Sequence, residues 1–252
     1  MRVTGRAVVE AGGRLPVLSS AAPWTLRRVR SDDPTACALR LVGSAAGPLA
    51  GDELALHLEL GRDARCELRA TGASIAQGRG GAPSTLRTDV ALGENAVLTA
   101  DPGPLIVCDG SRVDVSLHLA LAASATVRWD ETVVLGRTTD GGSGTATIRW
   151  DVTRAGRPLL RQTVDLADPA LRRWRGHLAG ARVLASALVT GPGVRARTVI
   201  GDPVAGVRHA VAQRLDDTSV LVTVLADDVH LAAKARDDLV PALSAGACAA
   251  LR

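Results

Sequence analysis

Hydrophobic and polar residues alternate one by one over long stretches of the chain, which is the pattern of strands that bury one face. Four Leu alternate with Ala, His and Glu over residues 54–60, and the same period returns over residues 113–121. Residues 147–152 and 159–164 flank the turn sequence RAGR and predict a β-hairpin. The pattern therefore predicts a mainly β body over residues 1–165.

The alternating segments also form an internal repeat. The form Leu-Gly/Ala-x-x-Ala-x-hydrophobic begins at Leu60, Leu92 and Leu121, with spacings of 32 and 29 residues. Each unit predicts a strand, a tight corner, an inward-facing Ala and a second short strand. Fixed periods of this size are typical of stacked coils, so we expect a β-helical or solenoid-like body of short strands. An antiparallel sandwich whose hairpins share one type of turn is the alternative.

The pattern changes after residue 165. Asp202-Pro203 has the form of an N-cap followed by Pro at the first helical position, and apolar residues follow at helical spacing as far as Leu215. Residues 219–225 predict a strand, and Asp228 begins a second helix that Pro241 kinks or shortens. We expect one domain over residues 1–252, in which a helix-strand-helix portion (166–252) packs on the β body.

The composition restricts the kinds of ligand that the chain can hold. It contains no Phe or Tyr and only four Trp, so it lacks the stacking surfaces that single-stranded nucleic acids and sugars commonly use. The core must come from Leu, Val and Ala, which suits the narrow interior of stacked coils. The net charge of +4 forms no extended basic run: the cluster around Arg28 is followed at once by Asp32 and Asp33, and the only other dense group lies at residues 172–175. We therefore expect no nucleic-acid partner.

The positions of Lys and Cys exclude further classes of binding motif. The single Lys, Lys234, lies in the sequence AAKA and cannot belong to a phosphate-binding Walker A loop, so any GTP or ATP must be bound by a partner. The four Cys are widely spaced, with no C-x-x-C pair. No apolar leader segment follows the first basic residues, and the longest uncharged stretches are too short for a membrane span. We expect a cytoplasmic protein with free thiols and no membrane partner.

Carboxylates are the candidate functional groups, because no known catalytic motif is present. Asp52 and Glu53 stand at the entrance of a strand, and Asp130 and Glu131 follow Trp129 on another. Such groups are either solvated strand ends or weak oxygen ligands that pass a divalent cation on. The five His, among them His57 and His118 on the faces of strands opposite to Leu, form no metal-binding motif.

A set of short motifs resembles one known family. Residues 46–54 (AGPLAGDEL) are similar to the Gly-Gly-φ-φ-Gly-Gly-Asp-x-Leu signature of the urease accessory protein D family, called UreD or UreH. The family's small-residue segment, Trp-Asp, Leu-Gly-Arg and x-Pro-Leu-Leu motifs match, in order, residues 71–74, 129–130, 135–137 and 157–160. The resemblance covers about residues 15–245 and rests on the ordered set, since each motif alone is weak.

The chain departs from this family at three places. Residues 75–78 (IAQG) replace a Lys-φ-Tyr-Arg segment, and residues 100–104 (ADPGP) keep the Pro of a Trp-Leu-Pro stretch but lose an acid. Gln162 stands in the segment after Pro-Leu-Leu where an acidic residue is common. The chain therefore resembles a divergent member from a GC-rich genome.

The resemblance implies a non-enzymatic scaffold with a β-helical body and two helices. Proteins of this family dock on apo-urease and recruit accessory protein F and, through it, the GTPase accessory protein G, so that nickel enters the urease active site. A water-filled internal path for the ion has been proposed for the family. Matching positions make Asp52, Glu53, Ser74 and Asp130 candidate residues of a transient Ni²⁺ path or of docking, and Glu131 is added because it adjoins Asp130. No tightly bound cofactor is implied.

Two other interpretations remain at this stage. A β-solenoid that binds or processes carbohydrate could use Asp52, Asp130 or Glu131 as acid and base, although the missing aromatic residues disfavour it. A scaffold for another complex, with no metal role, differs from the first interpretation only in its partner.

Overall fold

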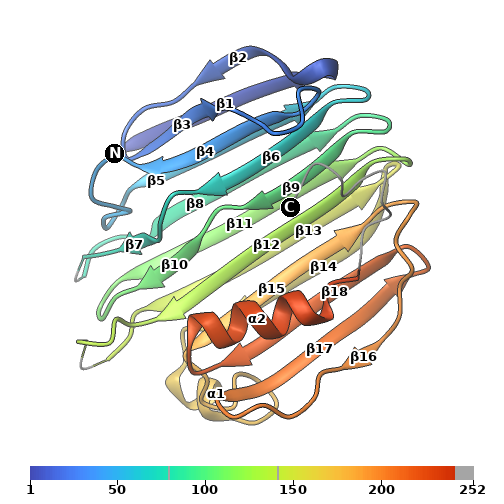
Figure 1. Cartoon of the computed structure of the whole chain (residues 1–252). Helices are drawn as coiled ribbons and strands as arrows, with labels where there is room; N and C mark the ends of the chain where they lie inside the picture. Colours follow the sequence, from blue (N-terminus) through green and yellow to red (C-terminus); the bar gives the residue numbers. More distant parts are fainter. Residues whose placement is uncertain (79, 141, 242–252) are drawn as a thin grey trace.

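Two β-sheets face each other in the computed structural model, which describes residues 1–78, 80–140 and 142–241 (Figure 1). The seven-stranded sheet consists, in spatial order, of β14 (Arg157–Asp165), β13 (Thr145–Arg154), β11 (Arg112–Leu121), β8 (Ser84–Leu92), β5 (Glu53–Leu60), β1 (Arg2–Glu10) and β2 (Arg14–Ser19). A short 3-10 helix, η1 (Ala11–Gly13), joins β1 to β2.

The second sheet has eleven strands and extends further than the first. Its order is β16 (Val199–Ile200), β17 (Val207–Asp216), β18 (Ser219–Ala226), β15 (Val183–Thr190), β12 (Thr126–Leu135), β9 (Val97–Asp101), β6 (Arg65–Ala70), β4 (Cys37–Gly43) and β3 (Trp24–Val29). Two further strands, β10 (Pro104–Val107) and β7 (Ser74–Ala76), continue it beside β12, with β10 between β12 and β7.

The chain alternates between the two sheets, so that successive coils stack in parallel. In the seven-stranded sheet, β5, β8 and β11 are parallel neighbours, and the register pairs Leu60 with Leu92 and Leu92 with Leu121. These are the positions that the repeat aligns. The solenoid-like, mainly β fold expected from the sequence is therefore confirmed. The hairpin is confirmed as well, because β13 and β14 are antiparallel and Arg154 pairs with Arg157.

The corner of each coil follows from its repeat sequence. Asp63 and Asn95 occupy equivalent positions and adopt positive φ angles of 58° and 57°, which Asp and Asn tolerate better than most residues. The Ala that follows each corner, and its counterpart Ala125 in the third unit, has an exposed fraction of 0%. An inward-facing Ala lets the corner close tightly over the core, so the repeated Ala is a packing requirement.

The core lies between the two sheets and contains mainly Leu, Val and Ala from both. Leu54, Leu56, Leu58 and Leu60 are each at most 2% exposed, as their alternation predicts. Trp129 of β12 and Trp150 of β13 supply the bulk that Phe and Tyr provide elsewhere. Cys37, Cys66 and Cys108 are free and buried, whereas Cys248 lies outside the described residues.

The prediction of a first helix in the carboxyl-terminal portion, from Asp202 to Leu215, is wrong. Residues 207–216 form β17, which pairs with β18 along its length, and Ala210 and Ala212 are buried on one face of it. Short apolar runs fit helical and strand periods equally well, and here pairing with β18 decides. The strand at residues 219–225 is confirmed as β18.

Two short helices are present among the described residues. The one expected after Asp228 is confirmed as α2 (Val229–Leu239), whose N-cap Asp228 accepts hydrogen bonds from His230 N and Leu231 N. It packs on β15, β17 and β18, on the outer face of the eleven-stranded sheet (Figure 1). The sequence pattern missed α1 (Pro169–Arg173), which begins with another Asp-Pro pair: Asp168 Oδ1 accepts from Ala170 N at 2.7 Å.

Candidate functional site

Two small pockets lie between the sheets and share one acidic side chain. The first, of about 50 Å³, extends from Trp24 and Ser74 to Trp129 and Glu131. The second, of about 10 Å³, is lined by Glu131, Trp150, Gln162 and Ser186 together with apolar side chains of β13, β14 and β15. Glu131 is the only ionisable residue among the described residues that line either pocket. It therefore stands where the two pockets meet.

The position of Glu131 follows from strand parity on β12. Trp129, Glu131 and Val133 face the interior, because successive side chains of a strand point to opposite faces. Trp150 donates from Nε1 to Glu131 Oε1 at 3.0 Å. Burial raises the pKa of Glu131 to about 7, and the Trp150 bond only partly opposes this rise. The carboxyl can therefore take up and release a proton near neutral pH.

The first pocket combines polar groups with an apolar wall. Ser74 Oγ accepts a hydrogen bond from Trp24 Nε1 at 3.3 Å, and the buried Trp129 Nε1 has no hydrogen-bond partner among the described residues. A volume of about 50 Å³ is enough for a few water molecules, since one needs roughly 10–15 Å³. The pocket can therefore hold water against both Ser74 and Glu131.

Two of the three places where the sequence departs from the UreD pattern line these pockets. Pro102 and Gly103, from the segment that keeps Pro and loses an acid, line the first pocket beside Ser74. Gln162, which stands where an acid is common, lines the second. Glu131 is therefore the only carboxylate among the described residues that line the two pockets, and neither of these departures places another beside it.

Asp130 points away from Glu131, to the outer face of β12 beneath α2. Arg128 Nη2 lies 2.8 Å from Asp130 Oδ2, and Arg236 Nη2 of α2 lies 3.4 Å from the same oxygen. Arg128 also pairs with Asp237 at 2.5 Å. Burial raises the pKa of Asp130, and the hydrogen bond from Arg128 and the charges of both Arg only partly offset the rise. This cluster attaches α2 to the sheet, and it gives Asp130 and Glu131 no shared cleft for acid-base catalysis.

Asp52 closes the turn that carries the family signature. Gly47-Pro48 is a cis peptide, and Asp52 Oδ2 accepts from Leu49 N at 2.9 Å. Its other oxygen accepts from the nitrogen of Met1 at 3.0 Å. Burial alone would raise the pKa of Asp52, but these bonds outweigh it and the pKa lies below its usual value. The neighbouring Glu53 is exposed and pairs with Arg2, so these two residues lie outside the linings of both interior pockets.

The structure explains why the Leu-Gly-Arg motif has Gly at its second position. Gly136 has φ of +79°, and a Cβ there would lie 2.6 Å from the carbonyl oxygen of Gly142. We expect Gly136→Ala to lower the free energy of unfolding by about 2–4 kcal/mol, from backbone strain and the clash together. Gly156→Ala is the matched control, because Gly156 has φ of +72° with no atom within 4 Å; it should cost about 1 kcal/mol. Equal losses in urea unfolding would show that the contact with Gly142 is unimportant.

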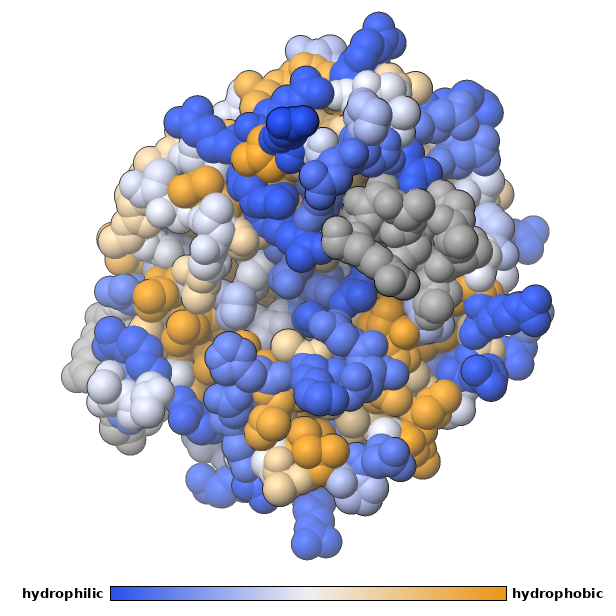
Figure 2. All heavy atoms as spheres, viewed as in Figure 1, coloured by the Kyte–Doolittle hydropathy of each residue, from blue (hydrophilic) through white to orange (hydrophobic). Residues whose placement is uncertain are grey.

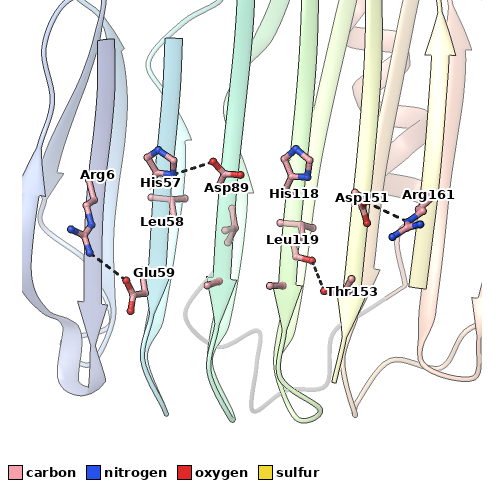
Figure 3. Close-up of a pocket in the computed structure, with 13 residues that line it drawn as sticks. Arg6, His57, Leu58, Glu59, Asp89, His118, Leu119, Asp151, Thr153 and Arg161 are labelled. Atoms are coloured by element: carbon pink, nitrogen blue, oxygen red, sulfur yellow. Dashed lines mark hydrogen bonds and ion pairs between the residues drawn. The ribbon is translucent and has the colours of Figure 1, made fainter. Parts of the chain in front are cut away.

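A shallow groove lies on the open face of the seven-stranded sheet (Figure 3). The register places oppositely charged and His side chains in one row across six strands, in the order Arg6, His57, Asp89, His118, Asp151 and Arg161. His57 Nδ1 lies 3.1 Å from Asp89 Oδ2, and Arg161 lies 3.4 Å from Asp151. Cross-strand pairs of this kind stabilise a sheet, and here they use the carboxylates that a cation would need.

The part of the chain that the structure describes contains no cluster of metal-binding side chains. No group of three or more His, Cys, Asp or Glu is close enough to hold a metal ion there. His57 and His118 lie in the groove, whereas His177 and His209 line a separate surface pocket. Neither described helix is long and apolar enough to cross a bilayer.

Comparison with known proteins agrees with the motifs. The family model described as "UreD urease accessory protein" matches residues 4–250. A urease accessory protein UreD from Frankia alni is 35% identical over 90% of this chain and 78% of its own length. UreD from Parafrankia sp. is 34% identical over 94% of this chain and 86% of its own, and UreD 3 from Streptomyces griseus is 33% identical over 92% of both. The chain therefore belongs to the UreD family of urease accessory proteins.

Proposed function

We propose that this protein is a maturation factor of urease that acts as a scaffold and not as an enzyme. It docks on apo-urease and, together with accessory proteins F and G, enables GTP-dependent insertion of nickel into the urease active site. Family membership over residues 4–250 carries the proposal. The single Lys supports the assignment of GTP to a partner, because Lys234 lies on α2 and pairs with Asp238.

In this proposal the interior pockets form part of a route for the ion. Nickel is the cargo, and it would pass Ser74 and Glu131, which offer oxygen ligands without a closed coordination sphere. One carboxylate with a pKa of about 7 binds a divalent cation weakly and can release it in exchange for a proton. Asp52 and Asp130 lie outside the pocket linings and have supporting roles, through their bonds to Leu49 and Arg236. The exposed Glu53 is a docking residue.

The proposal places the protein in the cytoplasm, in a complex with the urease subunits and accessory protein F and, indirectly, with accessory protein G. Deleting its gene should leave the urease polypeptides abundant but free of nickel, which metal analysis of purified urease would measure. The intact gene supplied on a plasmid should restore nickel and activity. Full urease activity in the deletion strain, without added nickel, would contradict the proposal.

A further inference from the structure

Positive charge is concentrated in one part of the chain. Residues 169–214 contain eight Arg and one acidic residue, Asp202, whereas the remainder of the chain has more acidic than basic residues. Two of these Arg are paired: Arg208 contacts Asp227 at 2.8 Å, and Arg214 pairs with Asp217. Within the described residues, no carboxylate forms an ion pair with the other exposed ones, which are Arg173, Arg175, Arg182, Arg195 and Arg197.

Exposed apolar side chains lie in the same part of the chain. Of the eight large hydrophobic residues that are exposed in the described ranges, five lie between residues 171 and 204. Ile200 is 77% exposed and Trp174 is 62% exposed; the others are Leu171, Val199 and Val204. Figure 2 shows apolar and hydrophilic side chains side by side at the lower end of the molecule, where Figure 1 places α1 and β16.

A surface pocket of about 640 Å³ lies between the turn after α1 and β17, the strand with which β16 pairs. Arg175 and His177 line it from the turn after α1, and Arg208 and His209 line it from β17. Leu225 of β18 contributes an apolar contact, and no acidic residue lines the pocket among the described residues. The ring of Trp174 lies close above Gly176, which also borders the pocket. Two Arg and two His side chains therefore line a concave site with an exposed aromatic side chain beside it.

We propose that this surface, formed by residues 169–180 and 199–209, docks an acidic segment of a partner protein that also carries an apolar side chain. Its charge calls for a negative partner, and Arg together with Trp is typical of the residues that dominate protein interfaces. Contacts to nucleic-acid phosphates do not need exposed Ile, Val and Leu, and a flat lipid surface does not fill a concave pocket. The inference rests on the proposed function, because urease and accessory protein F supply the partners to be tested.

The experiment measures binary binding of the purified full chain to apo-urease and to accessory protein F. The double variant Arg175→Glu/Arg208→Glu should weaken binding to at least one of them by about tenfold or more. Trp174→Ala/Ile200→Ala should weaken the same interaction without changing the charge. The matched control is Arg6→Glu/Arg161→Glu, which makes the same charge change at two ion-paired Arg of the groove and should leave affinity within about twofold, well below the effect of a hot-spot residue.

The possible outcomes separate this inference from the proposed function. Wild-type affinity of both surface variants for both partners would overturn the docking surface alone. Failure of the wild-type chain to bind either protein would overturn the proposed function, and the docking surface with it. Tighter binding to duplex DNA or to phosphatidylglycerol vesicles than to both proteins, at about 0.15 M salt and lost in the charge variant, would assign the surface to another class of partner and overturn the proposal.

Discussion

Replacing Glu131 by Gln is expected to lower the nickel content of urease by about tenfold or more, since removing a group that binds or orients a metal typically costs 10–100-fold in affinity. The substitution keeps the shape and an acceptor for Trp150 Nε1, which lies 3.0 Å from the carboxylate. It removes the one ionisable group among the described residues that line the two pockets. Nickel would be measured by metal analysis of urease purified from cells that express only the variant.

Glu53→Gln is the matched control, because it makes the same chemical change at an exposed carboxylate that pairs with Arg2. It should leave the nickel content near the wild-type value if the chain still docks. Urease with a full complement of nickel in the Glu131→Gln strain would contradict the route through the pockets. Binding of the variant to apo-urease, measured in parallel, separates a defect in transfer from a defect in assembly.

The same substitution should change how stability depends on pH. The folded pKa of Glu131, about 7, lies above the ordinary value of 4.5, so the native state favours the protonated carboxyl. The stability that the native state gains from this protonated carboxyl is fully present below about pH 4.5 and is lost as the pH rises to about 7. Glu131→Gln should remove this pH-dependent change in the free energy of unfolding, about 1–3 kcal/mol. Parallel pH profiles for the variant and the wild-type chain in urea unfolding would show that Glu131 does not titrate in this range.

Asp130→Ala should lower the free energy of unfolding by about 3 kcal/mol, because it leaves the buried Arg236 without its closest buried counter-charge. Arg236 is 5% exposed, and it would then share with Arg128 only the exposed counter-charge of Asp237. Urea unfolding measures the change. Hydrogen exchange of the α2 amides should rise in the variant, since the cluster attaches this helix to the sheet.

Asp237→Ala is the comparison for this cluster. Asp237 contacts both Arg but its side chain is 53% exposed, so its loss should cost less than about 1 kcal/mol. If the two variants lose the same stability, the buried position of Asp130 has no special role. A stable Asp130→Ala chain that still docks but delivers no nickel would instead indicate that Asp130 is a residue of the ion route.

The repeat in the sequence was sufficient to predict the stacked coils. Leu60, Leu92 and Leu121 pair in the observed register because each coil must present the same inward face to its neighbours. The carboxyl-terminal portion was harder to predict. Asp-Pro begins a helix at residue 168, whereas the pair at Asp202 precedes a turn and the strand β17. The local capping signals are alike at both places. The two segments differ because residues 207–216 can pair with the edge of β18 that β15 leaves open.

The candidate site shows a similar division. Asp130 and Glu131 are adjacent in sequence, yet one lies under α2 and the other between the sheets. The period-two pattern of β12 contains this information, because Trp129 and Val133 share the parity of Glu131. The pocket partners Trp150, Gln162 and Ser186 come from three other strands. Their approach depends on the closure of the two sheets, which no local pattern reports.

The register of the parallel coils raises the question of why the stack stops growing. Both outer strands of the seven-stranded sheet are antiparallel additions, β2 and β14, and each contains a Pro, Pro16 and Pro158. Proline has no amide hydrogen to donate to a further strand. Charged Arg14 and Arg161 add to this protection against strand addition. The sheet therefore resists polymerisation through its own hydrogen-bonding edges, although its interior is built from a unit that could be repeated without end.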